Sequence, residues 1–304
     1  MNETTGTFTE FYWKEYFALC KPKIVAMIVF TAMVGMFLAT PGFVPLDIFV
    51  FASLGIALAA ASAATINHIV DEKIDSLMTR TNRRPLQKGK VSAQGAMVSA
   101  ALLCLLSMIV LVTQVNTLTA VLTFGSLVGY GFIYSMYLKR ATPQNIVIGG
   151  AAGAAPPVLG WSAVSGTLDP YSLLLFCIIF AWTPPHFWAL AIYRRNDYAK
   201  ADIPMLPVTH GVGFTRLHIL LYTVILFIVS ILPYLTGMSG ITYLFGAVVL
   251  GGWFLYYAIK MQRNHSDQLA VHTFSFSIVY LLALFAFLLV DHYLYIFLSG
   301  SHAA

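Results

Sequence analysis

Long apolar stretches separated by short polar segments dominate the pattern of this chain. Nine of them reach the ~20 residues that a helix needs to cross the hydrocarbon core of a bilayer. They cover residues 23–41, 46–67, 93–113, 117–137, 143–164, 169–193, 216–236, 239–260 and 271–298. We therefore expect an all-α polytopic membrane protein. Its nine transmembrane helices would form a single bundle over residues 1–304 and enclose a cavity open to the cytoplasmic side.

The composition agrees with this expectation. The chain has 304 residues, of which 59% are hydrophobic and 10% are charged, and its mean hydropathy is +0.80. A soluble globular domain carries about 25% charged residues, so that class is excluded. Cys20, Cys104 and Cys177 lie far apart in or beside apolar stretches, and they predict neither a disulfide framework nor a metal site.

The 17 Lys and Arg residues all fall on one side of the membrane when nine spans are drawn. The positive-inside rule makes this side cytoplasmic. We therefore expect a multi-pass protein of the cytoplasmic membrane, with its N-terminus inside and its C-terminus outside. The net charge of +5 then reflects orientation in the lipid bilayer, and we expect no nucleic-acid partner. On the opposite side, Asp47, Asp169 and Asp291 are expected to be ordinary solvated residues.

Asn67, Asp71 and Asp75 lie at the inner end of the second predicted helix and are spaced four residues apart. Side chains with this spacing share one face of a helix. Carboxylates without a counter-charge are unfavourable at a membrane boundary, whereas two carboxylates beside an amide oxygen form a site of hard ligands suited to Mg²⁺. We interpret the three residues as Mg²⁺ ligands and, through the metal, as catalytic residues.

A basic stretch follows this motif directly. Arg80, Arg84 and Lys88 are suited to phosphate oxygens, so the two features together describe a site that holds a diphosphate through metal at the edge of a bilayer. A prenyl diphosphate fits, because its head is polyanionic and its tail is apolar. Metal and arginines would then stabilise the departing diphosphate. The alternative is a solvated helix end whose acids pair with Lys73 and Arg80.

The second long inner loop, residues 194–215, carries Asp197 and Asp202. Both inner loops can converge on one cavity, so we predict that Asp197 is a catalytic residue and metal ligand and that Asp202 is a further metal ligand. The spacing of five residues is a poor helical register, which weighs against Asp202. Charge balance with the neighbouring basic residues is the alternative: Arg194, Arg195 and Lys200.

Two predicted helices have unusual interiors. The sixth contains Pro184 and Pro185, which should open a kink, followed by His186. An intramembrane histidine is a functional candidate by default, and a hydrogen-bonded packing histidine is the equal alternative. The fifth has little side-chain bulk at residues 149–157. Close helix packing is the default interpretation, and room for a large flat substrate is the alternative.

In these motifs the chain resembles the UbiA-type intramembrane prenyltransferases. The pattern Asn67-xxx-Asp71-xxx-Asp75, with Arg84-Pro85-Leu86 after it, is similar to the first acidic motif of that family. Three further segments resemble its heme-farnesylating branch: Lys21-Pro22-Lys23, Pro184-Pro185-His186-Phe187, and Asp197-Tyr198 followed by Pro204-Met205-Leu206-Pro207-Val208. The likeness covers nearly the whole chain. Many family members space the second motif as Asp-xxx-Asp, and this chain departs from that spacing.

The resemblance implies farnesyl diphosphate and heme B as substrates, Mg²⁺ as cofactor, and heme O and diphosphate as products, for the assembly of heme-copper oxidases. A heme A-forming enzyme is a candidate partner. The terminal carbon of a heme vinyl group would attack the farnesyl cation, and water would capture the charge left beside the macrocycle. Substrate contacts beyond the diphosphate site would come from these residues: Lys21, Lys23, His186, Arg194, Arg195 and Tyr198.

Two other functions remain open at this point. Another enzyme of the same family would prenylate a quinone precursor, such as a hydroxybenzoate or dihydroxynaphthoate, and would need a tighter pocket. A transporter or membrane scaffold is the non-enzymatic alternative. Transporters usually carry their polar site near the midplane of the membrane, whereas these acids cluster at one face.

Overall fold

Long apolar helices make up most of the structure, a computed structural model that describes residues 6–79, 81–264 and 266–300. Among the described residues, eight helices are long and apolar enough to cross a membrane, and the bent pair Trp13–Leu19 and Pro22–Leu38 brings the number of candidate spans to nine. The two parts of this pair meet at 53°. The expected all-helical membrane bundle is therefore confirmed.

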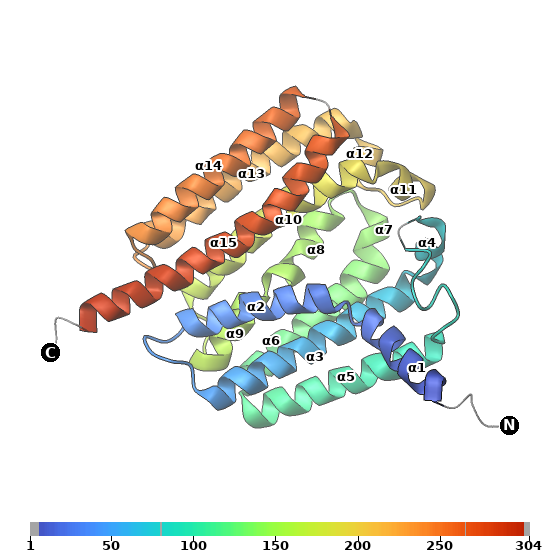
Figure 1. Ribbon diagram of the computed structural model, residues 1–304, viewed down its shortest axis with the longest axis horizontal. Helices are drawn as coiled ribbons and strands as arrows, with labels where there is room; N and C mark the ends of the chain where they lie inside the picture. Colours follow the sequence, from blue (N-terminus) through green and yellow to red (C-terminus); the bar gives the residue numbers. More distant parts are fainter. Residues whose placement is uncertain (1–5, 80, 265, 301–304) are drawn as a thin grey trace.

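The spans follow one another along the chain (Figure 1). They are formed by α2 (Pro22–Leu38), α3 (Leu46–Val70), α5 (Ala93–Gln114), α6 (Thr117–Val128) continued by η1 (Gly129–Leu138) and α7 (Lys139–Ala141), α8 (Asn145–Ala154) with α9 (Pro156–Ser165), α10 (Pro170–Tyr193), α13 (Gly211–Leu235), α14 (Ile241–Arg263) and α15 (Asp267–Gly300). The remaining helices are α1 (Gly6–Leu19), α4 (Glu72–Leu77), α11 (Arg195–Lys200) and α12 (Leu206–Thr209). Figure 1 shows α4, α7, α11 and α12 at the same end of the bundle.

Three spans differ from the simple helices that hydropathy suggests. The fourth changes from α to π geometry at Gly129, and this wider turn continues to Leu138. The fifth is divided at Ala155, directly before a Pro-Pro pair. The sixth runs as one helix through Pro184 and Pro185. Of the two proline pairs, only Pro156 and Pro157 mark a boundary between helices. They occupy the first turn of α9, where a missing backbone N–H costs little.

The low-bulk segment of the fifth span packs closely against its neighbours. A Cβ at Gly149 would lie 2.2 Å from Cδ2 of Tyr134 on η1, and a Cβ at Gly150 would lie 3.0 Å from Cγ2 of Thr183 on α10. Gly153 faces open space. Close packing of small residues is therefore confirmed at the first two glycines.

The two inner loops are held together. A buried apolar cluster contains side chains from both of them: Ile74 and Met78 from the first, and Ile203, Met205 and Leu206 from the second. Thr79 Oγ1 also donates a hydrogen bond to Asp197 Oδ1 at 3.3 Å. The expected convergence of these loops at one end of the bundle is confirmed.

Asp291 corrects one expectation from the sequence. Its side chain is only 6% exposed, and its carboxylate accepts hydrogen bonds from the backbone N–H groups of Gly240 and Tyr243, the latter at 3.1 Å. Gly240 is the N-cap of α14 and has no side chain to cap the helix. A carboxylate from α15 therefore satisfies the free N–H groups of α14 and also favours the positive end of its dipole.

We predict that Asp291→Ala lowers the stability of the bundle, because it leaves the backbone N–H groups of Gly240 and Tyr243 without their acceptor. The loss of a helix cap costs about 1–2 kcal/mol. Thermal unfolding in detergent should show a lower midpoint for this variant, and Asp291→Asn should recover part of the loss. Asp47→Ala is the control, because Asp47 is exposed in the first turn of α3. An unchanged midpoint for Asp291→Ala would contradict the capping role.

Candidate functional site

The first acidic motif lies where α3 ends and α4 begins. Asp71 separates the two helices, but the backbone N–H of Asp71 still bonds to the Asn67 carbonyl at 3.0 Å, and that of Asp75 bonds to the Asp71 carbonyl at 2.8 Å. The i to i+4 hydrogen bonds therefore continue across the junction, and residues spaced four apart remain positioned as they are in a helix. The three residues are buried, with relative exposures of 5%, 2% and 3% for Asn67, Asp71 and Asp75.

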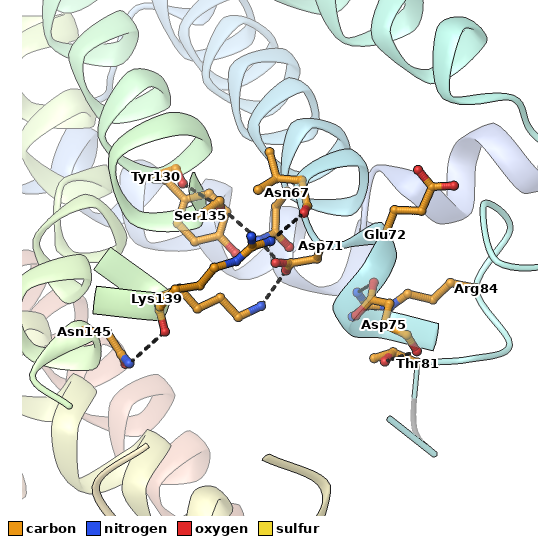
Figure 2. A network of polar contacts seen from close by, with 12 residues as sticks. Asn67, Asp71, Glu72, Asp75, Thr81, Arg84, Tyr130, Ser135, Lys139 and Asn145 are labelled. Atoms are coloured by element: carbon orange, nitrogen blue, oxygen red, sulfur yellow. Dashed lines mark hydrogen bonds and ion pairs between the residues drawn. The ribbon is translucent and has the colours of Figure 1, made fainter. Parts of the chain in front are cut away.

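Asp71 receives two hydrogen bonds on one oxygen. Its Oδ2 accepts from Asn67 Nδ2 at 2.9 Å and from Lys139 Nζ at 2.6 Å. Asn67 Nδ2 also donates to Ser135 Oγ at 3.0 Å, and Ser135 Oγ donates to the Tyr130 carbonyl at 2.9 Å (Figure 2). The π-helical segment η1 therefore brings a hydroxyl group to the acidic motif, and the helix that follows brings a lysine.

Asp75 is neutralised from the other side of the motif. Its Oδ2 forms an ion pair with Arg84 Nη1, and its backbone carbonyl accepts from Thr81 Oγ1 at 3.0 Å. Among the described residues, Asp71 pairs with Lys139 and Asp75 with Arg84 rather than with Lys73. Position 80 lies outside the described residues.

Lys21 completes the group of charges. It precedes α2 in a left-handed conformation, with φ 50°, which a non-glycine residue adopts at some cost. Its Nζ donates to Asn67 Oδ1. This cluster has three cationic side chains, Lys21, Arg84 and Lys139, and two carboxylates. Its net charge is therefore positive, which favours the binding of an anion.

One oxygen of this group is left without a partner. Asp71 Oδ1 is buried and has no hydrogen bond among the described residues. A buried carboxylate oxygen without a partner is unfavourable unless a ligand satisfies it. Asp71, Asp75 and the amide oxygen of Asn67 are the hard donors that Mg²⁺ prefers, so the residues present fit this ion.

The second acidic motif lies beside the first without joining it in one cluster. Asp197 contacts Thr79 and is 3.7 Å from Arg194 Nη1. Asp202 is exposed, has φ 52°, and lines a cavity of about 240 Å³ that also includes Lys73 and Arg140. Within the described ranges, no three His, Cys, Asp or Glu side chains are grouped closely enough to hold a metal ion. Metal binding by Asp197 and Asp202 stays a prediction.

The other residues singled out in the sequence are spread around this end of the bundle. Lys23 and Lys88 are exposed. Arg195 Nη1 bonds to Asp267 Oδ2 at 2.8 Å, and Tyr198 is buried in the apolar cluster that joins the inner loops. Within α10, His186 is buried against α15, with its Nδ1 at 2.6 Å from Ser277 Oγ.

Sequence reasoning missed Lys139 and Ser135 as members of the site. A signal for the lysine was present, because Lys139 and Arg140 are the only Lys or Arg residues between Lys90 and Arg194. Ser135 has no comparable signal. Its direction depends on the π-helical turn, which the apolar pattern of the fourth span does not reveal.

Comparison with known sequences agrees with these features. The model of the UbiA prenyltransferase family matches residues 28–289. A protein from Methylococcus capsulatus named protoheme IX farnesyltransferase is 60% identical over 282 residues, which are 93% of this chain and 95% of that protein. Membership of a prenyltransferase family excludes the two non-enzymatic alternatives, a transporter and a membrane scaffold.

Solved structures agree on the fold. A structure of digeranylgeranylglyceryl phosphate synthase has a TM-score of 0.78 at 18% identity and covers 92% of this chain and 98% of its own. A UbiA homolog from Archaeoglobus fulgidus, bound to DMAPP and Mg²⁺, has a TM-score of 0.61 at 19% identity and covers 90% of this chain and 99% of its own. By sequence and by fold, this chain belongs to the UbiA prenyltransferase family.

Proposed function

We propose that this protein transfers the farnesyl group of farnesyl diphosphate to the vinyl group of heme B, giving heme O and diphosphate. The observation that carries the proposal is the 60% identity to a protoheme IX farnesyltransferase over 93% of the chain. A site that combines buried carboxylates with an excess of cations supports it independently. The prenylation of a quinone precursor has no comparable support.

The diphosphate would bind at the junction of α3 and α4. Asn67, Asp71 and Asp75 would hold Mg²⁺, which supplies Lewis-acid stabilisation of the leaving diphosphate. Lys139 and Arg84, now paired with the carboxylates, would turn part of their hydrogen bonding toward phosphate oxygens. Ser135 positions the Asn67 amide, and Asn145 Nδ2 supports Lys139 by donating to its backbone carbonyl at 3.3 Å (Figure 2).

The reaction requires separate places for a charged head and an apolar chain. The allylic carbon–oxygen bond breaks and its electron pair leaves with the diphosphate. The vinyl carbon of heme then bonds to the allylic carbon. Water adds to the cationic carbon beside the macrocycle, and its proton is released. Tyr130 and Tyr134, stacked 5.5 Å apart next to the polar group, offer ring faces suited to an allylic cation.

The same end of the bundle would face the cytoplasm. The structure is a multi-pass membrane fold, and the clustering of Lys and Arg at the inner loops supports this orientation under the positive-inside rule. Both substrates have anionic groups, and Lys23, Arg194 and Arg195 remain candidates for the heme propionates. Asp197 and Asp202 remain candidates for a second metal contact.

The direct test supplies purified protein in detergent with farnesyl diphosphate, heme B and Mg²⁺, and measures heme O by mass spectrometry. A parallel reaction replaces heme with 4-hydroxybenzoate or 1,4-dihydroxy-2-naphthoate. We expect a Mg²⁺-dependent product with heme alone. Prenylated benzoate or naphthoate without heme O would overturn the proposal.

We predict that Asp71→Asn and Asp75→Asn each reduce kcat/KM by about 100-fold or more, because a metal contributes several kcal/mol to charge stabilisation in the transition state. Glu72→Gln is the matched control, since Glu72 lies between the two acids in sequence but is exposed. The measurement is heme O formation at saturating Mg²⁺, with folding checked by thermal unfolding. Wild-type turnover in either aspartate variant would remove the metal ligands from the mechanism.

We predict that Arg84→Ala mainly weakens donor binding. A hydrogen bond to a charged group contributes ~1.5–3 kcal/mol, so the KM for farnesyl diphosphate should rise about tenfold or more. Arg83→Ala controls for net charge, because Arg83 is its exposed neighbour. If the KM for the donor does not change, Arg84 serves only to balance Asp75.

We predict opposite labelling at the two ends of the bundle. In a variant whose native cysteines are replaced by alanine, Thr167→Cys lies between α9 and α10 and Asn82→Cys lies in the first inner loop, both at exposed positions. A membrane-impermeant thiol reagent added to cells with an intact cytoplasmic membrane should modify only Thr167→Cys. Both should react after permeabilisation. Modification of only Asn82→Cys in intact cells would reverse the proposed orientation.

A further inference from the structure

We propose that His186 binds the iron of the heme acceptor through its Nε2 atom, and that Ser277 fixes the imidazole tautomer that makes this possible. This inference rests on the proposed function, since heme is the acceptor there. It assigns a role to a buried polar pair that the diphosphate site does not use.

The hydrogen bonds around Ser277 determine which nitrogen of His186 carries the proton. Ser277 Oγ lies 2.6 Å from the Phe274 carbonyl and 2.6 Å from His186 Nδ1. A carbonyl oxygen can only accept, so the single hydroxyl proton of Ser277 is directed to Phe274. His186 Nδ1 must then donate to Ser277 Oγ. In a neutral imidazole this leaves Nε2 with a lone pair, the form that ligates a metal.

The ring of His186 lies between two aromatic side chains that stack on it. Its centroid lies 4.1 Å from that of Trp182, at an interplanar angle of 20°, and 4.6 Å from that of Phe274, at 28°. Trp182 Nε1 donates to the Ser277 carbonyl at 2.7 Å. The two stacked rings cover both faces of the imidazole, and Ser277 holds its Nδ1 edge. The edge that carries Nε2 is the one that Ser277 does not hold.

The Nε2 atom has no hydrogen-bond partner among the residues that the structure describes, although His186 is only 9% exposed. A histidine retained for packing alone would bury this nitrogen in contact with a donor. The next residue along α10, Phe187, is 38% exposed. The rings of His186 and Phe187 are in contact, with centroids 5.3 Å apart at an interplanar angle of 89°, so the histidine directly adjoins an exposed side chain.

The position of His186 along α10 suits the shape of heme. Arg194 and Arg195 follow it by eight and nine residues, a little over two helical turns toward the inner end. A macrocycle anchored at His186 would lie among apolar side chains, and its propionate edge would extend toward the basic residues at the end of the helix. Along α10 the surroundings therefore change from apolar to basic, and this change matches heme, which has an apolar ring and an anionic edge.

The inference is tested by the absorption and EPR spectra of ferric heme B bound to the purified protein. We expect a histidine-ligated spectrum in the wild type. It should be lost in His186→Gly and restored by millimolar imidazole. His186→Gln, which can still bond to Ser277, provides a second loss variant if the glycine variant does not fold. His272→Ala is the control, because His272 is exposed on the same helix as Ser277.

Ser277→Ala separates ligation from the setting of the tautomer. Removing a partner of this kind usually weakens metal binding by about 10–100-fold, so heme affinity should fall in that range and Ser277→Thr should recover it. Identical heme spectra for the wild type and the His186 variants would overturn the inference. Heme O formation by the wild type is scored separately, so a failure of the proposed function is distinguished from a failure of iron ligation.

Discussion

Two carboxylates buried at the end of a membrane helix require neutralisation, and much of the inner end of this protein is arranged around that requirement. Asp71 and Asp75 lie at a boundary where an unpaired charge is costly. Their partners come from elements far apart in the sequence: Lys139 from the end of the fourth span, Arg84 from the first inner loop, and the Lys21 amine through Asn67. The buried acids therefore link the first, second and fourth spans.

This requirement also accounts for two irregular features of the backbone. Lys21 has a left-handed conformation directly before α2, and from there its side chain reaches Asn67. The fourth span is π-helical from Gly129 to Leu138, and Ser135 meets Asn67 within this segment. Both departures from regular structure occur where a polar group has to be brought to the motif, which agrees with the tendency of strained residues and π turns to lie at functional sites.

The sequence predicted those features that depend on local spacing or on the length of apolar stretches. The candidate spans followed from nine apolar stretches of about 20 residues, and the helical placement of the acidic motif followed from the four-residue spacing of Asn67, Asp71 and Asp75. Features that depend on distant contacts could not be predicted in this way. In the sequence, Asp291 cannot be distinguished from other acidic residues at the membrane boundary, because its role depends on the packing of α15 beside the start of α14. Ser135 cannot be distinguished from other small residues, because the π turn sets the direction of its side chain.

The balance of charge also bears on how metal and diphosphate enter the site. Lys21, Lys139 and Arg84 already supply more positive charge than Asp71 and Asp75 neutralise. A divalent ion arriving alone would add to this excess and would compete with Lys139 and Arg84 for the same carboxylates. A metal–diphosphate complex brings its own negative charge, so the cations could turn to phosphate oxygens while the metal takes their place on the carboxylates. Electrostatics therefore favours joint binding of metal and donor over binding of the metal first.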